Sequence, residues 1–122
     1  MSGYYLGWNN KCYTLHTSDL SFSDASDDCQ TEYGGNLASI PNQYVQDFIE
    51  DIPGKTGRTW IGGQYVNDAW TWLDGTTFNF NHNDDTDDPD DDSETALYIM
   101  HNGDDEWEDD DPSEEHDYIC QF

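Results

Sequence analysis

The chain has 122 residues, which suits one domain of ordinary size, and its 28 acidic residues face only three basic ones, for a formal net charge of −25. A surface this negative repels nucleic acid and anionic lipid, so neither is expected as a partner, whereas divalent cations and cationic mineral faces are attracted. The aromatic share of 15% is unlike a disordered acidic chain and supplies ring area for a small core. No apolar run is long enough to span a bilayer, and no signal peptide is visible at the start.

The first part of the chain predicts a strand followed by a helix. Residues 12–17 have good β propensity and form the predicted strand. Ser23 can cap a helix in which Ala25, Cys29 and Tyr33 recur at steps of four and therefore share one face. The glycine pair that follows ends this helix.

A second helix is predicted to begin at the cap Asn42, with an apolar face made of Val45, Phe48, Ile49 and Ile52. The pattern then becomes extended and aromatic, which predicts strands at 60–63, 70–73, 97–100 and 117–120. The pair Asn102-Gly103 is a hairpin turn signal. The order of one strand, two helices and several strands predicts an α+β fold.

The acidic residues are concentrated in the second half of the chain. Eighteen of the 28 lie between Asp84 and Asp117, and no lysine or arginine lies there. The densest stretches, 84–92 and 104–111, flank the predicted strand at 97–100. Acids that served only solubility or halophilic adaptation would be spread over the whole surface, so this arrangement predicts a cation site built from two loops that meet in space.

Several motifs occur in an order that resembles the C-type lectin family. They cover nearly the whole chain and are Gly7-Trp8, Cys12-Tyr13, residues 29–40 (CQTEYGGNLASI), residues 60–63 (WIGG, with Gly63 in place of Leu), residues 70–75 (WTWLDG) and residues 118–120 (YIC). The WIGGQ form is similar to invertebrate members. The resemblance implies a single looped α+β domain over residues 1–122, with two helices, two small antiparallel sheets and a long acidic loop region.

The resemblance also implies a disulfide between Cys29 and Cys120. Closing a loop of this length stabilises a fold by roughly 4–5 kcal/mol in the chain-entropy model, and a disulfide implies a secreted protein in an extracellular, oxidising location. Both cysteines of a second family disulfide are replaced together, by Ala96 and Pro112. The third cysteine, Cys12, is either a buried free thiol or the partner of a cysteine outside this chain.

Family members that bind sugar hold a calcium ion with a Glu-Pro-Asn or Gln-Pro-Asp tripeptide, a following Glu, and the Asn-Asp of a Trp-Asn-Asp motif. The matching positions imply five ligands here, namely Asp88, Asp90, Glu94, Glu108 and Asp109. All five are carboxylates, which suit the hard calcium ion but leave excess negative charge. A second ion would relieve that charge, and its candidate ligands are Asp84, Asp85, Asp87, Asp91, Asp92 and Asp110.

The sequence leaves two functions open. In the first, the domain is a calcium-binding lectin-like module that engages a carbohydrate through the ion. The family's hydrogen-bond donors to sugar are replaced, however, because Asp88 and Asp90 only accept when ionised and Glu108 stands in place of Asn. In the second, the protein is an acidic matrix protein that binds calcium carbonate or calcium phosphate surfaces.

Two other kinds of site are not expected. An enzyme is not expected because no carboxyl group is set apart from the others, as a general acid with a raised pKa would be. A zinc or copper site is only weakly indicated because the histidines lack close spacing, so they are expected at the surface; they are His16, His82, His101 and His116.

Overall fold

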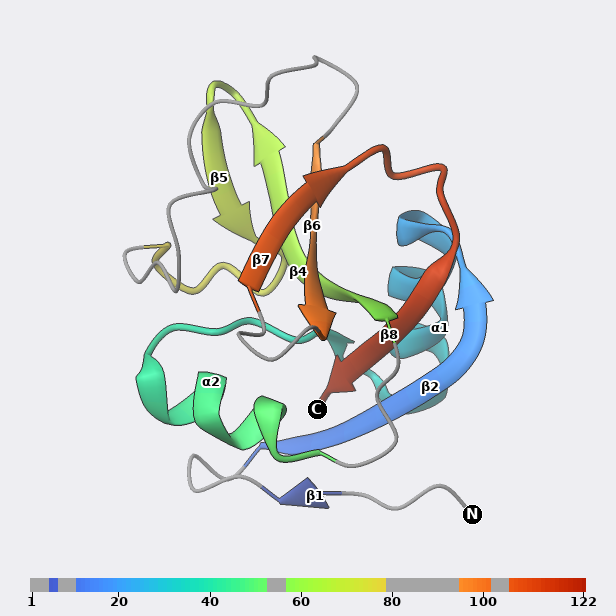
Figure 1. The fold of residues 1–122 in the computed structure, drawn as a ribbon, viewed down its shortest axis with the longest axis vertical. Coiled ribbons are helices and arrows are strands. Elements are labelled where there is room, and N and C mark those ends of the chain that lie inside the picture. The colour runs from blue at the N-terminus through green and yellow to red at the C-terminus, as the bar shows by residue number, and fades with distance from the viewer. Residues whose placement is uncertain (1–4, 7–10, 53–56, 79–94, 102–105) are drawn as a thin grey trace.

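The computed structural model describes residues 5–6, 11–52, 57–78, 95–101 and 106–122. Its elements are β1 (Tyr5–Leu6), β2 (Cys12–Leu20), α1 (Phe22–Tyr33), β3 (Asn36–Leu37), α2 (Gln43–Glu50), β4 (Gly57–Val66), β5 (Ala69–Trp72), β6 (Ala96–His101), β7 (Glu106–Asp110) and β8 (His116–Gln121). Two helices and a mixed sheet confirm the predicted α+β class (Figure 1). No helix in these ranges is long and apolar enough to cross a membrane.

The strands form one continuous sheet in the order β1-β2-β8-β4-β6-β7, with β3 paired to β8 and β5 paired to β4. The two small sheets that the resemblance implies are therefore joined. The junction is a parallel pairing of β4 with β8, in which Thr59 lies opposite Asp117 and Trp60 opposite Tyr118. In Figure 1, β1 and α2 lie in the lower part of the molecule, α1 lies on the right beside β2, and β5, β6 and β7 lie in the upper part. The path through the sheet ends at the acidic strand β7.

The first helix begins at a different cap from the one predicted. The Ser21 Oγ, and not Ser23, accepts the backbone N–H three residues further on at 3.3 Å. The helix begins earlier than predicted because its first residue, Phe22, packs against Trp60. The buried Phe22 ring meets the Trp60 ring edge-on, with 5.4 Å between the ring centroids. At the other end Gly34 adopts a left-handed conformation with φ of 70° and closes the helix, as predicted.

A disulfide joins Cys29 on the buried face of α1 to Cys120 in β8, which is the pair that the family resemblance implies. The two sulfur atoms are 2.03 Å apart, and the linked residues are 91 positions apart in the sequence. The bond therefore fixes the first helix to the strand at the centre of the sheet. Cys12 is a free thiol of intermediate exposure.

The second helix begins at Asn42, as predicted, with the Asn42 side chain accepting a backbone N–H at 3.1 Å. Its unexpected feature is Gln46, which is completely buried. The Gln46 Oε1 accepts from the Trp107 Nε1 at 2.9 Å. Because Trp107 lies in β7, this buried hydrogen bond ties α2 to the acidic edge strand.

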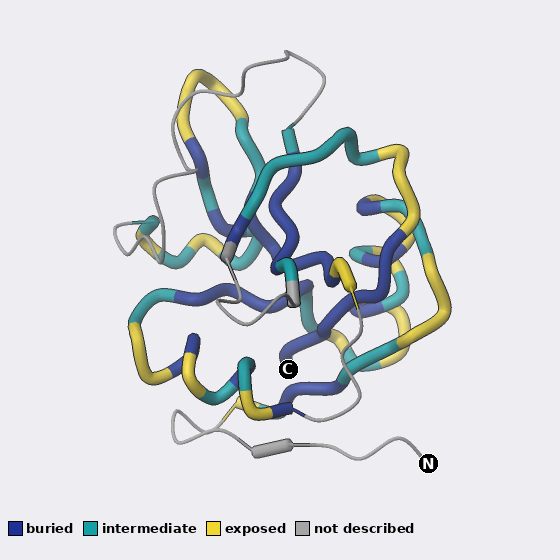
Figure 2. Tube along the Cα trace, in the orientation of Figure 1, coloured by how far each residue is buried: buried dark blue, intermediate teal, exposed yellow. Residues whose placement is uncertain are grey.

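Four tryptophans lie in the core of the described part of the chain, namely Trp60, Trp70, Trp72 and Trp107. Trp60 and Trp107 are 0% exposed and Trp72 is 2% exposed. The Trp72 and Trp107 rings meet edge to face with centroids 5.4 Å apart, and Phe78 stacks on Trp72 at 4.7 Å. The buried stretches converge at the centre of the molecule in Figure 2. Because Trp60, Trp72 and Trp107 are buried, their rings are unavailable for stacking on a sugar.

A two-residue turn connects β4 to β5, with Val66 opposite Ala69. Its residues, Asn67 and Asp68, both have positive φ angles, of 52° and 64°. Asn and Asp tolerate this conformation better than most residues, and it matches the twist of a hairpin. This turn was not predicted from the sequence.

Candidate cation-binding site

The edge strand β7 occupies part of a region that was predicted to be a loop. Residues 106–110 pair antiparallel with β6, so the prediction of a loop over 104–111 was wrong in this range. The reason is Trp107, whose ring enters the core and fixes the alternation of the residues around it. The register places Ala96, at the start of β6, opposite Asp110, at the end of β7.

Alternation along β7 divides its acids between two faces. Asp109 shares a face with the buried Trp107, whereas Glu108 lies opposite Tyr98 and shares the other face with Asp110. Burial, together with the negative charge of Glu108, raises the pKa of Tyr98 to about 12. Because β7 is the outermost strand of the sheet, an ion at its free edge can still be reached by carboxylates from both faces.

Asp110, a candidate ligand for a second ion, is held by two basic groups. The His116 Nε2 donates to its carboxylate at 2.9 Å, and the Arg58 guanidinium lies 3.6 Å away. Arg58 also lies over the Tyr98 ring, 5.2 Å from its centroid. His116 is only 8% exposed and packs against Trp60, so the prediction of a surface histidine was wrong here. A cation at Asp110 would have to compete with these groups.

The other predicted ligands lie outside the described residues, and they are Asp84, Asp85, Asp87, Asp88, Asp90, Asp91, Asp92 and Glu94. The histidine His82 and the turn Asn102-Gly103 also lie outside them, as does the His101 side chain. The structure does show where the acidic segment rejoins the sheet. The Thr95 carbonyl accepts from the Tyr65 N–H at 2.9 Å, and the next residue lies opposite Asp110.

A part-buried hydrogen-bond network around Asp74 precedes the acidic segment in the sequence. The Asp74 carboxylate accepts from the Ser39 Oγ at 2.8 Å, from the Gln121 Nε2 at 2.7 Å and from the Thr76 N–H at 3.0 Å. Burial acts to raise the pKa of Asp74, but these hydrogen bonds outweigh it and lower the pKa. Asp74 is therefore a structural carboxylate that links the turn after β5 to Ser39 and to Gln121 in β8.

One other group of potential ligand atoms occurs in the described part of the chain, formed by His16, Asp28 and Cys120. It is unsuitable for a metal because the Cys120 sulfur is committed to the disulfide. The His16 ring stacks on Tyr118 at 4.8 Å, and the Tyr118 hydroxyl donates to Asp28 at 2.6 Å. Burial lowers the pKa of His16, which favours its neutral form. His16 and Asp28 therefore belong to a packed cluster around the Tyr118 ring.

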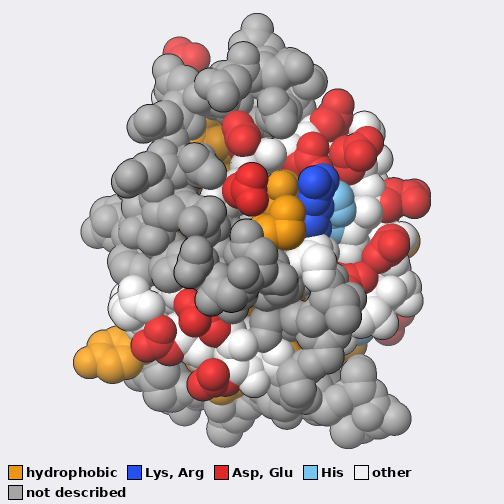
Figure 3. All heavy atoms as spheres, in the orientation of Figure 1, with side chains coloured by type: hydrophobic (Ala, Val, Ile, Leu, Met, Phe, Trp, Pro, Cys, Tyr) orange, Lys and Arg blue, Asp and Glu red, His pale blue; other side chains and the backbone are white. Residues whose placement is uncertain are grey.

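On the face drawn in Figure 3, acidic side chains lie around a blue basic side chain and a pale blue histidine. The sequence model of the Lectin C-type domain matches residues 18–122. The chain therefore belongs to the C-type lectin domain family, whose members are binding modules rather than enzymes.

Individual relatives agree with this assignment. The chain is similar to the galactose-specific lectin nattectin of Thalassophryne nattereri, with 40% identity over 86 residues, 61% of this chain. The match covers 52% of nattectin, so the chain spans about half the length of that relative. Rheacalcin-1 of Rhea americana is 32% identical over 128 residues, covering 96% of this chain and 91% of the relative. The structure of a calcium-independent type II antifreeze protein superposes with a TM-score of 0.86 at 29% identity, covering 100% of this chain and 92% of that one.

Proposed function

We propose that this domain is an extracellular calcium-binding module that engages its ligand, a carbohydrate, through an ion held at the free edge of β7. The ion's ligands are Asp88, Asp90 and Glu94 from the acidic segment together with Glu108 and Asp109 from the strand. The observation that carries the proposal is the β6–β7 register, in which the start of β6 lies opposite the end of β7. The chain leaves the acidic segment at that point, so Glu94 is only two residues from the position opposite Asp110.

The chemistry of the donor set fits calcium. Calcium takes six to eight oxygen ligands, and five carboxylates supply them with room for water or a ligand's hydroxyl groups. The strand is held in place from behind, because the buried Trp107 beside the ligand pair is hydrogen-bonded to α2. The remaining acids supply ligands for a second ion, which offsets the excess negative charge. They are Asp84, Asp85, Asp87, Asp91, Asp92 and Asp110.

Calcium dependence needs its own test because the family fold does not decide it. The antifreeze protein that superposes on this chain is described as calcium-independent. What favours calcium here is the chain's own charge, since eighteen acids lie between Asp84 and Asp117 without a lysine or arginine. Such a charge density opposes compaction of the region unless counterions bind.

The carbohydrate proposal is supported by the lectin family and by nattectin, whose name describes it as galactose-specific. Asp88 and Asp90 accept but do not donate hydrogen bonds when ionised, so sugar hydroxyl groups would bind by coordinating the ion and donating to the carboxylates. An extracellular location is supported by the Cys29–Cys120 disulfide, which requires an oxidising compartment to persist.

The second candidate is a calcium mineral surface, such as calcium carbonate or phosphate. It is favoured by the same feature that weakens sugar binding, namely the dense set of carboxylate acceptors between Asp84 and Asp92. Such a surface presents many calcium ions, so each carboxylate run could contact several of them at once.

Thermal unfolding with calcium, with magnesium at equal ionic strength and with chelator tests the cation site. Calcium at 100 times its dissociation constant should add about 2.7 kcal/mol of stability by mass action. The double variant Glu108→Gln/Asp109→Asn should lose this gain, whereas the exposed control Glu114→Gln should keep it. Equal gains in all three proteins would mean that calcium only screens charge, and the proposed site would be wrong.

Glycan binding in calcium then separates the two ligands. Saturable binding to a sugar that chelator abolishes supports the lectin reading. Adsorption to calcium carbonate without any glycan binding supports the mineral reading, provided that Asp→Asn changes in the acidic segment abolish it.

A further inference from the structure

The turn between β7 and β8 presents a serine at the surface. Ser113 is exposed and lies within residues 111–115, which belong to no helix or strand. The Asp111 carboxylate accepts hydrogen bonds from the Ser113 N–H, at 2.9 Å, and from the Ser113 hydroxyl, at 2.8 Å. Both hydrogen bonds are exposed, so the carboxylate of another protein can replace Asp111 as the acceptor of the hydroxyl proton.

The place of Ser113 in the fold distinguishes it from the other hydroxyl residues that precede an acid. In the described part of the chain, five serines or threonines are directly followed by Asp or Glu, namely Ser18, Ser23, Ser26, Thr31 and Ser113. The first lies in β2 and the next three lie in α1. An enzyme that modifies a side chain takes the flanking backbone into its own cleft, which a paired strand or a helix permits only after local unfolding. Of these five residues, Ser113 is the one outside a helix or strand.

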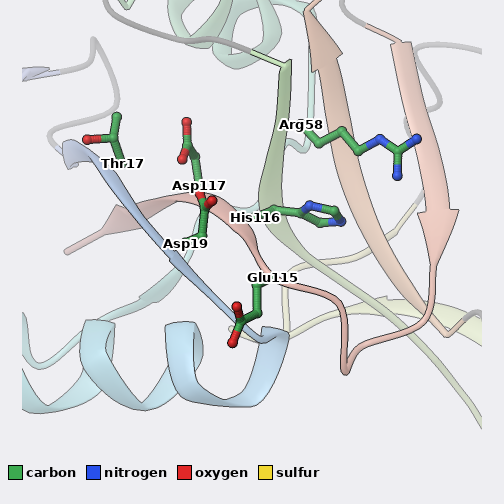
Figure 4. A pocket seen from close by; sticks show the side chains of 6 residues that line it. All are labelled: Thr17, Asp19, Arg58, Glu115, His116 and Asp117. Atoms are coloured by element: carbon green, nitrogen blue, oxygen red, sulfur yellow. The ribbon is translucent and has the colours of Figure 1, made fainter.

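Two exposed glutamates, Glu114 and Glu115, directly follow this serine. Among the described residues no ion pair neutralises either of them. Glu115 shares the wall of an open pocket with Arg58 and His116, and Figure 4 shows its side chain extending away from those two basic groups. Both glutamates can therefore meet the basic side chains of a partner, which bind carboxylates through charge-assisted hydrogen bonds.

The surface beside Ser113 has room for an added phosphoryl group. An open pocket of about 410 Å³ lies between this turn and the start of α1. It is lined by Ser21, Ser23, Asp111, Pro112 and Ser113. The Phe22 N–H donates to the Pro112 carbonyl at 2.9 Å, which holds the turn beside the helix. The positive end of the α1 dipole favours an anion here, and the charge of Asp111 opposes one. Because the pocket is open, the added group displaces only water.

We propose that Ser113 is a phosphorylation site for an acid-directed serine kinase, which recognises it through Glu114 and Glu115. The Ser113 Oγ bonds to the terminal phosphorus of a nucleoside triphosphate, the bond from that phosphorus to the bridging oxygen breaks, and the nucleoside diphosphate leaves. The serine proton passes to a carboxylate of the kinase. The modified turn gains a charge of about −1.5 to −2 near neutral pH. This modification does not depend on a calcium ion at the edge of β7.

Incubation of the intact, disulfide-bonded protein with ATP, magnesium and an acid-directed kinase that phosphorylates casein tests the site. Peptide mass spectrometry then locates the phosphate and gives the initial rate at each residue. Ser113 should be phosphorylated faster than the four hydroxyl residues of β2 and α1. The variant Glu114→Gln/Glu115→Gln should lower the rate at Ser113 by at least about tenfold, because each glutamate loses a charge-assisted hydrogen bond to the kinase. The matched control Asp27→Asn/Glu32→Gln removes two exposed acids of α1 and should keep the wild-type rate.

Each outcome bears on the assignment of Ser113. Preferred phosphorylation of Ser113 that slows in the glutamate variant but not in the control supports it. Absence of phosphate at Ser113, while the same kinase preparation phosphorylates casein, would overturn it. Equal rates in the glutamate variant and the wild type would also overturn it, because the two glutamates would then not direct the kinase. Equal rates at Ser113 and at the residues of α1 would contradict the selection of an exposed turn.

Discussion

The buried hydrogen bond between Gln46 and Trp107 should be worth a measurable share of the protein's stability. Both side chains are completely buried, and the Gln46 Oε1 accepts the indole N–H at 2.9 Å. In Gln46→Leu the leucine fills similar space, but the Trp107 N–H loses this acceptor. A buried donor left unsatisfied costs about 1–3 kcal/mol, so the free energy of unfolding should fall by that amount.

Urea unfolding with the disulfide intact and chelator present measures this difference. The Gln46 Nε2 also donates to Glu50 at 2.9 Å at a more accessible position, so Glu50→Ala is the control for losing that second bond. We expect Glu50→Ala to cost less than about 1 kcal/mol, because a typical hydrogen bond contributes about 0.5–1.5 kcal/mol and this one is partly solvated. If Gln46→Leu lowered stability no more than Glu50→Ala did, the bond would not be what anchors β7.

Three further changes test other parts of the fold. Ser21→Ala should lower stability by about 0.5–2 kcal/mol in urea unfolding, whereas Ser23→Ala should be nearly neutral, and the reverse order would contradict Ser21 as the cap. Reducing the Cys29–Cys120 disulfide should cost about 4–5 kcal/mol, measured by unfolding with and without reductant, and a loss below about 1 kcal/mol would mean that the unfolded chain is already constrained. The folded-state pKa of Asp117, about 6, lies above its ordinary 3.8, so its contribution to stability is present at low pH and lost as the pH rises through 6. In chelator, the melting temperature of Asp117→Asn minus that of the wild type should therefore increase from about pH 5 to about pH 7, and a constant difference would contradict the raised pKa.

Local sequence signals predicted those parts of the fold that depend on neighbouring residues. Asn42 and Gly34 limit helices because capping and left-handed backbone are local properties. The Ser21 cap was missed because two serines were available and the choice depended on Phe22 packing against Trp60, a contact between distant segments. The disulfide followed from the family resemblance and not from the spacing of the cysteines.

The features that sequence reasoning missed depend on strand pairing. Residues 106–110 read as an acidic loop because four of the five are charged, but Trp107 makes the segment an edge strand. Acids on an edge strand also discourage pairing with another chain, which gives the same residues a structural use. Asp19 and Asp117 are nearly one hundred residues apart in the sequence, and the pairing of β2 with β8 brings them into contact. No pattern within either segment could have indicated that contact.

A calcium titration of the wild type and of Glu108→Gln/Asp109→Asn at constant ionic strength is the most direct test of the central proposal. Ions held by specific ligands saturate at a defined number per chain, whereas counterions attracted by net charge do not saturate and decrease as salt rises. We predict saturable calcium binding that persists in salt and is lost, for the β7 edge ion, in the double variant. Binding that never saturates, or that is identical in the two proteins, would contradict a calcium site at the edge of β7.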